Sequence, residues 1–342
     1  MEYRVAEREG RKLCVGYRDF CPADVSGLIA CIRDEYAGTY LKPEFYDPGF
    51  ILKGVASGAF HFLVAEAEGK IAAALGLKLN PPYDTMCEWI TGVVLKEYRR
   101  FGIMNVLFQL ALDKMATMPG ISAGYGFSVT YHDISQRAMG RLGFMPCGFL
   151  LSVLAIQNIA HSYERDRNMK HHHIIIVRRQ EKEDAGTIYV PAEHEDIARR
   201  VYASLGVAVV VVRDFVPLYG KSCCRVENDA GQASCTIWVE ESGADLAERI
   251  TDIESEHQQV NQTFNIFLNV SDERAVAAYQ ELRKLGYFFA GWRPVCGRRE
   301  IMVLHNPGRV QLDFASLVIA EAGEYLREYV ATCYENRGNY YG

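Results

Sequence analysis

The chain has 342 residues, which is too many for one ordinary hydrophobic core and suits two domains of average size. Hydrophobic residues make up 49% and charged residues 23% of the sequence, as in soluble globular proteins. The net charge of -6 at pH 7 argues against broad nucleic-acid binding, because such binding needs a large basic surface.

The N-terminal residues and the cysteines bear on the cellular compartment. Residues 1–9 are too polar for a secretory signal peptide, and no apolar run approaches the ~20 residues that span a bilayer. The ten cysteines form no Cys-x-x-Cys pair, and the adjacent Cys223 and Cys224 suit neither a shared metal nor an easy disulfide. We therefore expect a cytoplasmic protein with reduced thiols, no membrane partner and no metal ion.

Hydrophobic periodicity and turn residues predict alternating strands and helices along the first 180 residues. In chain order we expect a strand at 13–18, a helix at 23–36, a hairpin of strands at 60–66 and 70–78, a strand at 88–95, a helix from 103 that stops at 118–120, a strand at 125–130, a short helix from 135 to 143, and strands at 145–154 and 171–178. A linker follows at 181–186. Farther on, the valines at 209–212 predict one buried strand, and 313–335 is a candidate helix, although Gly323 counts against an unbroken one.

Residues 94–107 combine a strand end, a tight turn with arginines and a glycine, and a helix start. Consecutive backbone N–H groups would point into this turn, and the positive end of the helix dipole would lie behind them. Gly102 allows the backbone to approach a bulky anion, and Arg99 and Arg100 add positive charge. The segment therefore predicts a site for a pyrophosphate.

The run Arg99-Arg100-Phe101-Gly102-Ile103-Met104 resembles the Arg/Gln-x-x-Gly-x-Gly/Ala motif of the GNAT superfamily of acyl-CoA-dependent N-acyltransferases. It matches at the first and fourth positions and departs at the last, where Met104 replaces a small residue. The resemblance implies an α/β (α+β) fold, with a mixed, mostly antiparallel central sheet flanked by helices. It also implies acetyl-CoA or another acyl-CoA as co-substrate, with contacts at Val94, Leu95, Arg99, Arg100, Phe101, Gly102, Ile103, Met104 and Ser135.

Two segments share a pattern of helix, glycine stop and strand: Leu142-Gly143-Phe144 with Gly148, and Leu285-Gly286-Tyr287 with Gly291. Independent use of one common helix stop is an alternative, but the matching flanks favour a duplicated unit. With residues 129–136, these runs resemble a bacterial group of tandem GNAT proteins, some of which are fused to an anti-sigma-factor-like ATPase module.

The resemblance divides the chain into an N-terminal GNAT acyl-CoA-binding domain at 1–180, a degenerate GNAT-like domain at 187–310 and a helical tail at 311–342. Residues 238–245, at the place of the anion loop in the second copy, carry three acids and no arginine. Because acidic side chains there would repel a pyrophosphate, we expect the second copy to have lost CoA binding.

Acyl transfer to an amine requires a bound acyl-CoA, a polarised carbonyl and an amine without its extra proton. The resemblance implies that backbone amides near Val94 and Leu95 polarise the carbonyl. It implies that Glu88, at the start of the fourth predicted strand, is the general base. A solvated glutamate at a strand edge is an equally good interpretation.

A general acid is harder to identify, because Met139 stands where many family members have a tyrosine. Tyr131 and His132, at the exit of the strand at 125–130, are substitutes by location, and His132 could also act as a base through a water. Packing or capping of the short helix is the simpler role for them.

Two other clusters have structural alternatives. A strand would place His171 and His173 on one face and His172 on the other, which favours a surface strand over a zinc site. The aromatic residues between the first helix and the second strand suit either an acceptor pocket or a small hydrophobic cluster: Tyr36, Tyr40, Phe45 and Tyr46.

The leading hypothesis is an N-acetyltransferase that acts on a small-molecule or peptide amine, with a homodimer as one open oligomeric state. A non-catalytic acyl-CoA sensor or protein-binding regulator is the first alternative, since Met104 adds bulk near the phosphates. An aminoacyl-tRNA-dependent transferase is the second, although the acidic net charge makes a nucleic-acid partner unfavourable.

Overall fold

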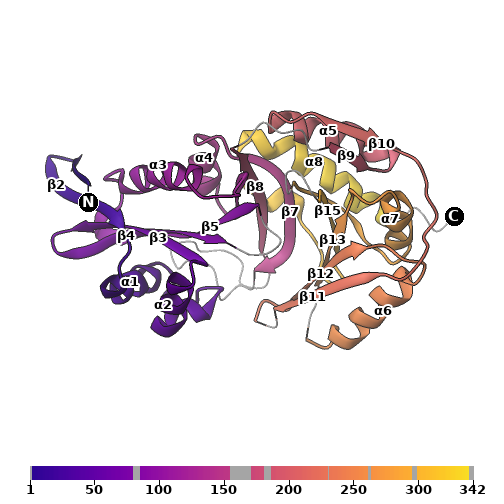
Figure 1. The fold of residues 1–342 in the computed structure, drawn as a ribbon, viewed down its shortest axis with the longest axis horizontal. Coiled ribbons are helices and arrows are strands. Elements are labelled where there is room, and N and C mark those ends of the chain that lie inside the picture. Colours follow the sequence, from indigo (N-terminus) through magenta and orange to yellow (C-terminus); the bar gives the residue numbers. More distant parts are fainter. Residues whose placement is uncertain are drawn as a thin grey trace. The chain divides into compact units, whose positions relative to one another are not determined.

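The computed structural model describes residues 2–79, 85–154, 171–180, 186–229, 231–260, 263–294 and 299–338. The chain forms two compact units (Figure 1). The first unit contains Met1–Gly126, and the second contains Phe127–Ala155 and Met169–Gly342. The domain boundaries expected at residues 180 and 310 stay predictions.

The first unit is built on a mostly antiparallel sheet with the strand order β1-β2-β3-β4-β5-β6, in which only β5 and β6 run parallel. Its strands are β1 (Glu2–Arg8), β2 (Arg11–Asp19), β3 (Phe60–Ala67), β4 (Lys70–Leu79), β5 (Met86–Val94) and the first part of β6 (Ala123–Val129). The helices α1 (Val25–Tyr36) and α2 (Pro48–Ala56) lie on one face of this sheet, and α3 (Ile103–Ala116) lies on the other (Figure 1). The predicted elements of this region are confirmed, and β1 and α2 are additions that the sequence did not predict.

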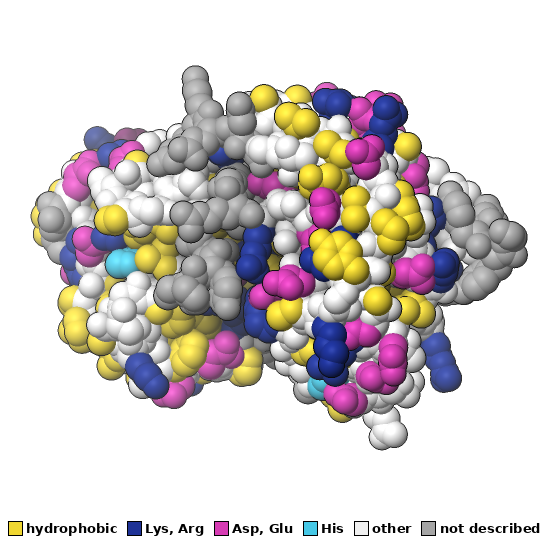
Figure 2. Space-filling model, turned by 45° about the vertical axis from the view of Figure 1, so that its right-hand side comes forward, with side chains coloured by type: hydrophobic (Ala, Val, Ile, Leu, Met, Phe, Trp, Pro, Cys, Tyr) yellow, Lys and Arg dark blue, Asp and Glu magenta, His cyan; other side chains and the backbone are white. Residues whose placement is uncertain are grey.

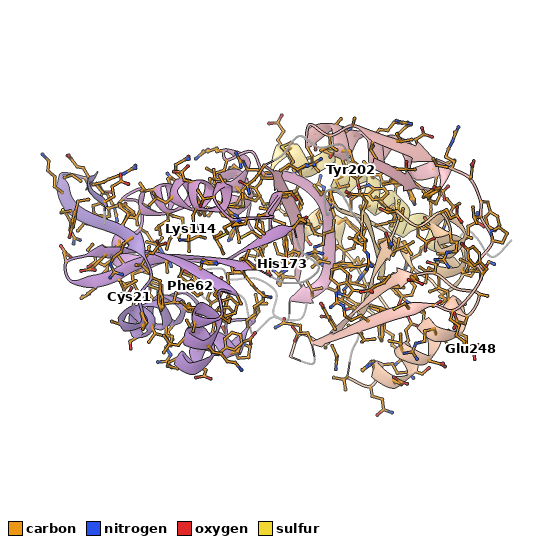
Figure 3. The ribbon with its side chains drawn as sticks, in the orientation of Figure 1. Cys21, Phe62, Lys114, His173, Tyr202 and Glu248 are labelled. Atoms are coloured by element: carbon orange, nitrogen blue, oxygen red, sulfur yellow. The ribbon has the colours of Figure 1, made fainter. Side chains whose placement is uncertain are left out.

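The core under α1 and α2 is largely aromatic. Phe45 is 2% exposed, and its ring centroid lies 5.5 Å from that of Phe60 and 6.4 Å from that of Phe62, which Figure 3 labels on β3. Tyr36, Tyr40 and Tyr46 belong to the same cluster: Tyr40 is buried, and the other two are partly buried against it. The hydrophobic-cluster interpretation of these aromatics is therefore correct. Burial of each such ring stabilises the fold by about 2–3 kcal/mol.

The second unit has the strand order β6-β8-β7-β14-β15-β13-β12-β11, beginning with the last part of β6. Its further strands are β7 (Met145–Leu154), β8 (His171–Arg179), β11 (Cys223–Asp229), β12 (Ser234–Glu241), β13 (Thr263–Asn269), β14 (Phe288–Arg293) and β15 (Ile301–Asn306). Its helices are α4 (Ile134–Gly140), α5 (Glu195–Ser204), α6 (Leu246–His257), α7 (Ala275–Lys284) and α8 (Glu321–Glu335).

The two glycine stops noticed in the sequence have the same local structure. Gly143 after α4 and Gly286 after α7 adopt φ values of 82° and 90°. The following residues also donate equivalent hydrogen bonds back into the helix, Phe144 to Met139 at 3.1 Å and Tyr287 to Leu282 at 3.2 Å. These matching ends support the proposed duplication.

The glycines that follow these stops pair with each other. β7 and β14 meet antiparallel at Gly148 and Gly291. A Cβ on Gly291 would lie 2.2 Å from the Gly148 Cα, so two side chains could not fit at this crossing. The approach of the two backbones therefore requires glycine at both positions.

Two expectations for the second unit are wrong in part. Val209–Val212 do form a strand, β10, which pairs parallel with β9 (Gly186–Tyr189), but Val210 is 60% exposed and none of the four is buried. The predicted tail helix begins at Glu321 instead of near Asp313, after a short 3-10 turn at Phe314–Ser316. Gly323 does not break α8, which is continuous to Glu335. A Cβ at position 323 would lie 2.8 Å from Ile319 and 3.1 Å from Ile174, so glycine lets the helix pack closely there.

Basic and acidic side chains lie interspersed on the face of the protein drawn in Figure 2. Among the described residues, no helix is long and apolar enough to cross a membrane.

Candidate functional site

The turn between β5 and α3 has the backbone that the sequence predicted. Arg100 and Gly102 both adopt left-handed conformations, with φ values of 68° and 74°, and no atom lies within 4 Å of where a Gly102 Cβ would be. Within the part of the chain that the structure describes, the N–H groups of residues 101–104 donate to no acceptor. They lie at the positive end of a 14-residue helix, which is the arrangement that binds phosphate groups in proteins.

Arg99 contributes to the turn through bracing contacts. Its guanidinium pairs with Glu35, and its Nε donates to the Val94 carbonyl over 3.2 Å. Much of its charge is therefore offset by Glu35. Arg100, in contrast, is exposed and has no ion-pair partner in the described regions. Of the two arginines expected to supply charge, Arg100 is the one whose charge remains available.

The β1–β2 hairpin adds two arginines that sequence reasoning missed. Arg8 donates from Nη1 to the Arg99 carbonyl over 3.1 Å, so it holds the turn from outside. Arg8 and Arg11 also lie over the ring of Phe101, 5.9 and 5.6 Å from its centroid. Phe101 is only 7% exposed, so its ring holds the turn in position and is not available to contact a ligand. These contacts were missed because β1 was not predicted.

β5 separates from β6 shortly before it reaches this turn. The two strands pair only from Met86 to Glu88, although β5 continues to Val94. β5 is also bulged against β4, where the register shifts between Ala74 and Gly76. Thr91 at the bulge has φ 52°, a conformation that costs a β-branched residue about 1–3 kcal/mol. The strain marks a backbone held in an unusual course beside the predicted anion site.

Two contacts define the surroundings of the bulge. The hydroxyl of Tyr40 lies 3.5 Å from the Thr91 Oγ1, and both side chains are buried. Burial raises the pKa of Tyr40, which therefore stays a neutral phenol. The N–H of Leu95 donates to Ala72 over 2.9 Å, so this amide, expected to polarise a carbonyl, already has an acceptor.

Glu88 is buried, with 5% exposure, so the solvated-glutamate interpretation is wrong. Its carboxylate lies 3.1 Å from the Lys42 Nζ and 3.5 Å from the Lys78 Nζ. Burial alone would lower the pKa of Lys42, but the carboxylate of Glu88 outweighs it and raises that pKa. An amine that approached Glu88 would therefore compete with two lysines, and the role of Glu88 as general base stays a prediction.

Tyr131, His132 and Ser135 belong to the second unit. Tyr131 is buried, and its ring meets those of His132 and His171 edge to face, at 4.9 and 5.6 Å between centroids. The side chain of Gln136 fastens this segment to the tail, because it donates to the carbonyls of Val129, His132 and Val318 and accepts from the N–H of Ala320. The catalytic and cofactor-binding roles of these three residues stay predictions.

The surface-strand interpretation of His171–173 is wrong, because β8 is an interior strand between β6 and β7. His172 and His173 are 5% and 7% exposed. His172 accepts the Ser152 N–H at its Nδ1 over 2.7 Å, and burial lowers its pKa to about 3. Three or more His, Cys, Asp or Glu side chains suited to a metal ion do not gather anywhere among the described residues.

The corresponding turn of the second unit, between β12 and α6, is occupied by its own chain. Gly243 N–H donates to the Ser222 Oγ over 2.9 Å, and Ala244 N–H donates to the Gly220 carbonyl over 3.1 Å. Asp245 accepts the Ser222 N–H over 2.7 Å. In addition, β12 and β13 stay paired over six residue pairs, so no gap opens between them. These contacts support the expected loss of anion binding in the second copy.

Residues 27–144 match the model of the acetyltransferase (GNAT) family. The sequence has no significant match among curated proteins.

Solved structures similar to this chain include an N-acetyltransferase from Staphylococcus aureus Mu50, which is 15% identical, with a TM-score of 0.40 and coverage of 49% of this chain and 99% of that one. The ribosomal-protein-alanine N-acetyltransferase from Brucella melitensis is 17% identical, with a TM-score of 0.40 and coverage of 48% and 99%. The PaiA N-acetyltransferase from Thermoplasma acidophilum, solved in complex with coenzyme A, is 16% identical, with a TM-score of 0.35 and coverage of 48% and 98%. The match to the acetyltransferase (GNAT) family model covers about a third of the chain and includes the turn between β5 and α3.

Proposed function

We propose that this protein transfers an acyl group from acetyl-CoA, or from another acyl-CoA, to the amine of a small molecule or peptide in the cytoplasm. The observation that carries the proposal is the turn between β5 and α3. Its backbone is left-handed at Arg100 and Gly102, and the N–H groups of residues 101–104 lie at the positive end of α3. The pyrophosphate of CoA is the ligand that fits this turn.

In the proposed reaction the amine nitrogen attacks the thioester carbonyl carbon, and the C–S bond breaks. The backbone of β5 beyond Glu88 is separated from β6, and its bulge at Thr91 would present N–H groups toward the developing oxyanion. The amine loses a proton, and the CoA thiolate leaves as a stable anion that needs little help from a general acid. Tyr131 and His132 are retained as candidate acids on the sequence argument alone.

Glu88 is the candidate base, and its lysine partners define what that role would need. Its carboxylate can accept a proton only after Lys42 or Lys78 moves away or is replaced as counter-ion by the incoming ammonium group. The acceptor's own positive charge is suited to such an exchange. This mechanism therefore favours acceptors that arrive protonated.

The same contacts favour one second candidate, a protein that binds acyl-CoA without turnover. A carboxylate held by two lysines, together with the bulk of Met104 in the turn, suits a binding role as well as catalysis. Binding of acetyl-CoA without acetylation of any amine in a broad panel would support this second candidate.

The test is calorimetric titration of acetyl-CoA and CoA into the wild type and Gly102→Glu. A carboxylate at position 102 would repel the pyrophosphate, so we expect affinity to fall roughly 100-fold. Gly102→Gln, which has the same size and backbone strain without the charge, should lose much less.

Gly58→Glu is the matched control for folding. Gly58 also has a positive φ, 75°, with nothing within 4 Å of a Cβ, but it lies in the turn between α2 and β3. Its variant should bind as the wild type does. The proposal fails if the folded wild type binds neither ligand, or if Gly102→Glu binds both unchanged.

A further inference from the structure

The strand β1 ends its sheet with one edge unpaired in the described structure, because it contacts only β2 as a strand. Tyr3 and Val5 on this strand are 66% and 71% exposed. Cys14, which pairs directly with Val5 on β2, is exposed as well. A long edge strand with exposed apolar side chains is an unusual surface for a monomer, since it offers a template for another strand.

The hairpin turn shows which backbone groups point outward. Glu9 and Gly10 have φ values of 50° and 80°, as in a two-residue type I′ turn. The residues that flank such a turn, Arg8 and Arg11, form a hydrogen-bonded pair, and the pairs along the ladder then alternate. Tyr3, Val5 and Glu7 are therefore the non-hydrogen-bonded positions, so their N–H and C=O groups point away from β2.

We propose that a second copy of this chain pairs with β1 antiparallel across a two-fold axis at Val5. Only residues with outward N–H and C=O groups can form the hydrogen-bonded pairs of such a ladder, so odd positions must oppose odd positions. Overlap of all seven residues of β1 then places Val5 opposite Val5 of the partner subunit, and Tyr3 opposite Glu7 of the partner subunit.

The side chains favour this register over its neighbours. It places Glu2 opposite Arg8 of the partner subunit at both ends of the ladder, which pairs opposite charges. A shift of two residues in one direction would set Arg4 against Arg4 of the partner subunit. A shift in the other direction would set Arg4 against Arg8 of the partner subunit. Like charges directly opposite each other destabilise a ladder, so both shifts are disfavoured.

The proposed ladder also reaches the anion-binding turn. Arg8 already donates to the Arg99 carbonyl, and its contact with the exposed Glu9 is long, at 3.6 Å. In the dimer a carboxylate from the second chain would lie opposite Arg8 and help to hold it in position. Formation of the dimer does not depend on the proposed acyl transfer, because only β1 forms the ladder.

The first test is the molar mass in solution, measured by sedimentation equilibrium for the wild type, Val5→Pro and Val5→Thr. We expect a wild-type dimer. Proline at position 5 removes an N–H that points outward and leaves the β2 ladder intact. The dissociation constant of the dimer should therefore rise at least about tenfold. Threonine keeps the N–H and should keep the dimer. A monomeric wild type, or a dimer that Val5→Pro leaves unchanged, would overturn the proposal.

The second test reports the register. In a Cys14→Ser background, Val5→Cys should form an intermolecular disulfide under mild oxidation, because paired Cα atoms in this ladder lie about 5.5 Å apart. Tyr3→Cys in the same background should not, because its two copies would be four residues out of register, about 13 Å apart. The Cys14→Ser variant alone measures how much cross-linking comes from the other exposed cysteines. Equal cross-linking of the two variants would contradict the register.

Discussion

The two strand-to-helix turns of this protein differ in what satisfies their backbone. At Gly102, before α3, the N–H groups of residues 101–104 have no acceptor among the described residues, and a Cβ would meet open space. At Gly243, before α6, the chain itself supplies the acceptors, and a Cβ would lie 2.3 Å from the Lys221 carbonyl carbon. The turn at Gly102 is therefore open, whereas the segment at 220–222 fills the turn at Gly243.

The two units also differ in the polar groups that they bury. In the second unit, His194 is 2% exposed, stacks on Phe289 at 4.4 Å, and lies 2.6 Å from the Tyr279 hydroxyl and 2.8 Å from that of Tyr329. Burial lowers its pKa to about 3, as it does for His172 in the same unit. The second unit thus buries His172 and His194 in their neutral form. The pH dependence of its stability tests this.

The largest expected effect is a loss of stability of the second unit between pH 7 and pH 5. The unfolded chain takes up a proton on each histidine near pH 6.5, whereas the folded unit resists protonation of His172 and His194 down to about pH 3. The unfolded state therefore binds more protons in this range, and stability falls as the pH falls. We expect a loss of about 2 kcal/mol for each histidine.

Urea unfolding followed by tryptophan fluorescence would measure this loss. A Trp89→Phe background leaves only Trp238 and Trp292, both in the second unit. In His194→Gln the pH dependence should fall by about half. Equal unfolding free energies at pH 7 and pH 5 would show that these histidines are not protected from protons.

The next effect in size is the contrast between alanine substitutions at the two turns. Gly243→Ala forces a Cβ against the backbone of Lys221 and Ser222, which must move, so we expect a loss of about 2–3 kcal/mol. Gly102→Ala meets no atom and adds only backbone strain, so about 1 kcal/mol is expected. Urea unfolding of both variants tests the difference. Equal losses would mean that the second turn is as open as the first.

The sequence could predict what depends on neighbouring residues, and it failed where distant segments meet. The turn before α3 is local: Gly102, two arginines and a helix start lie within a few positions of one another, so their order was sufficient to predict a tight turn and a helix there. The partners of Glu88 are not local, because Lys42 comes from a loop 46 residues earlier and only the fold brings it to β5. Sequence alone therefore left open whether Glu88 is buried or solvated, and the fold shows that it is buried.

Strand burial failed for a related physical reason. β1 has both faces exposed over most of its length, so it lacks the alternation of apolar residues that marks a strand. β8 begins with three histidines, which read as a polar surface, yet His172 is satisfied by the backbone of Ser152 inside the sheet. A polar residue can be buried when a backbone group pairs with it, and that partner is invisible until the strands are arranged.

The smallest effect concerns Asp245, which accepts the Ser222 N–H at the closed turn. That hydrogen bond lowers the pKa of Asp245, so its contribution to stability is present at neutral pH and is lost as the pH falls through its lowered folded-state value. Asp245→Ala should therefore destabilise the second unit less than Gly243→Ala does, and only above the acidic range.

Asp245→Ala should not create a second nucleotide site, because Glu240 and Glu241 still place negative charge beside the turn. Calorimetric titration should give one acetyl-CoA per chain for both wild type and variant. A second binding event in Asp245→Ala would mean that Asp245, and not the remaining charge of Glu240 and Glu241 or the segment at 220–222, keeps the second turn from binding CoA.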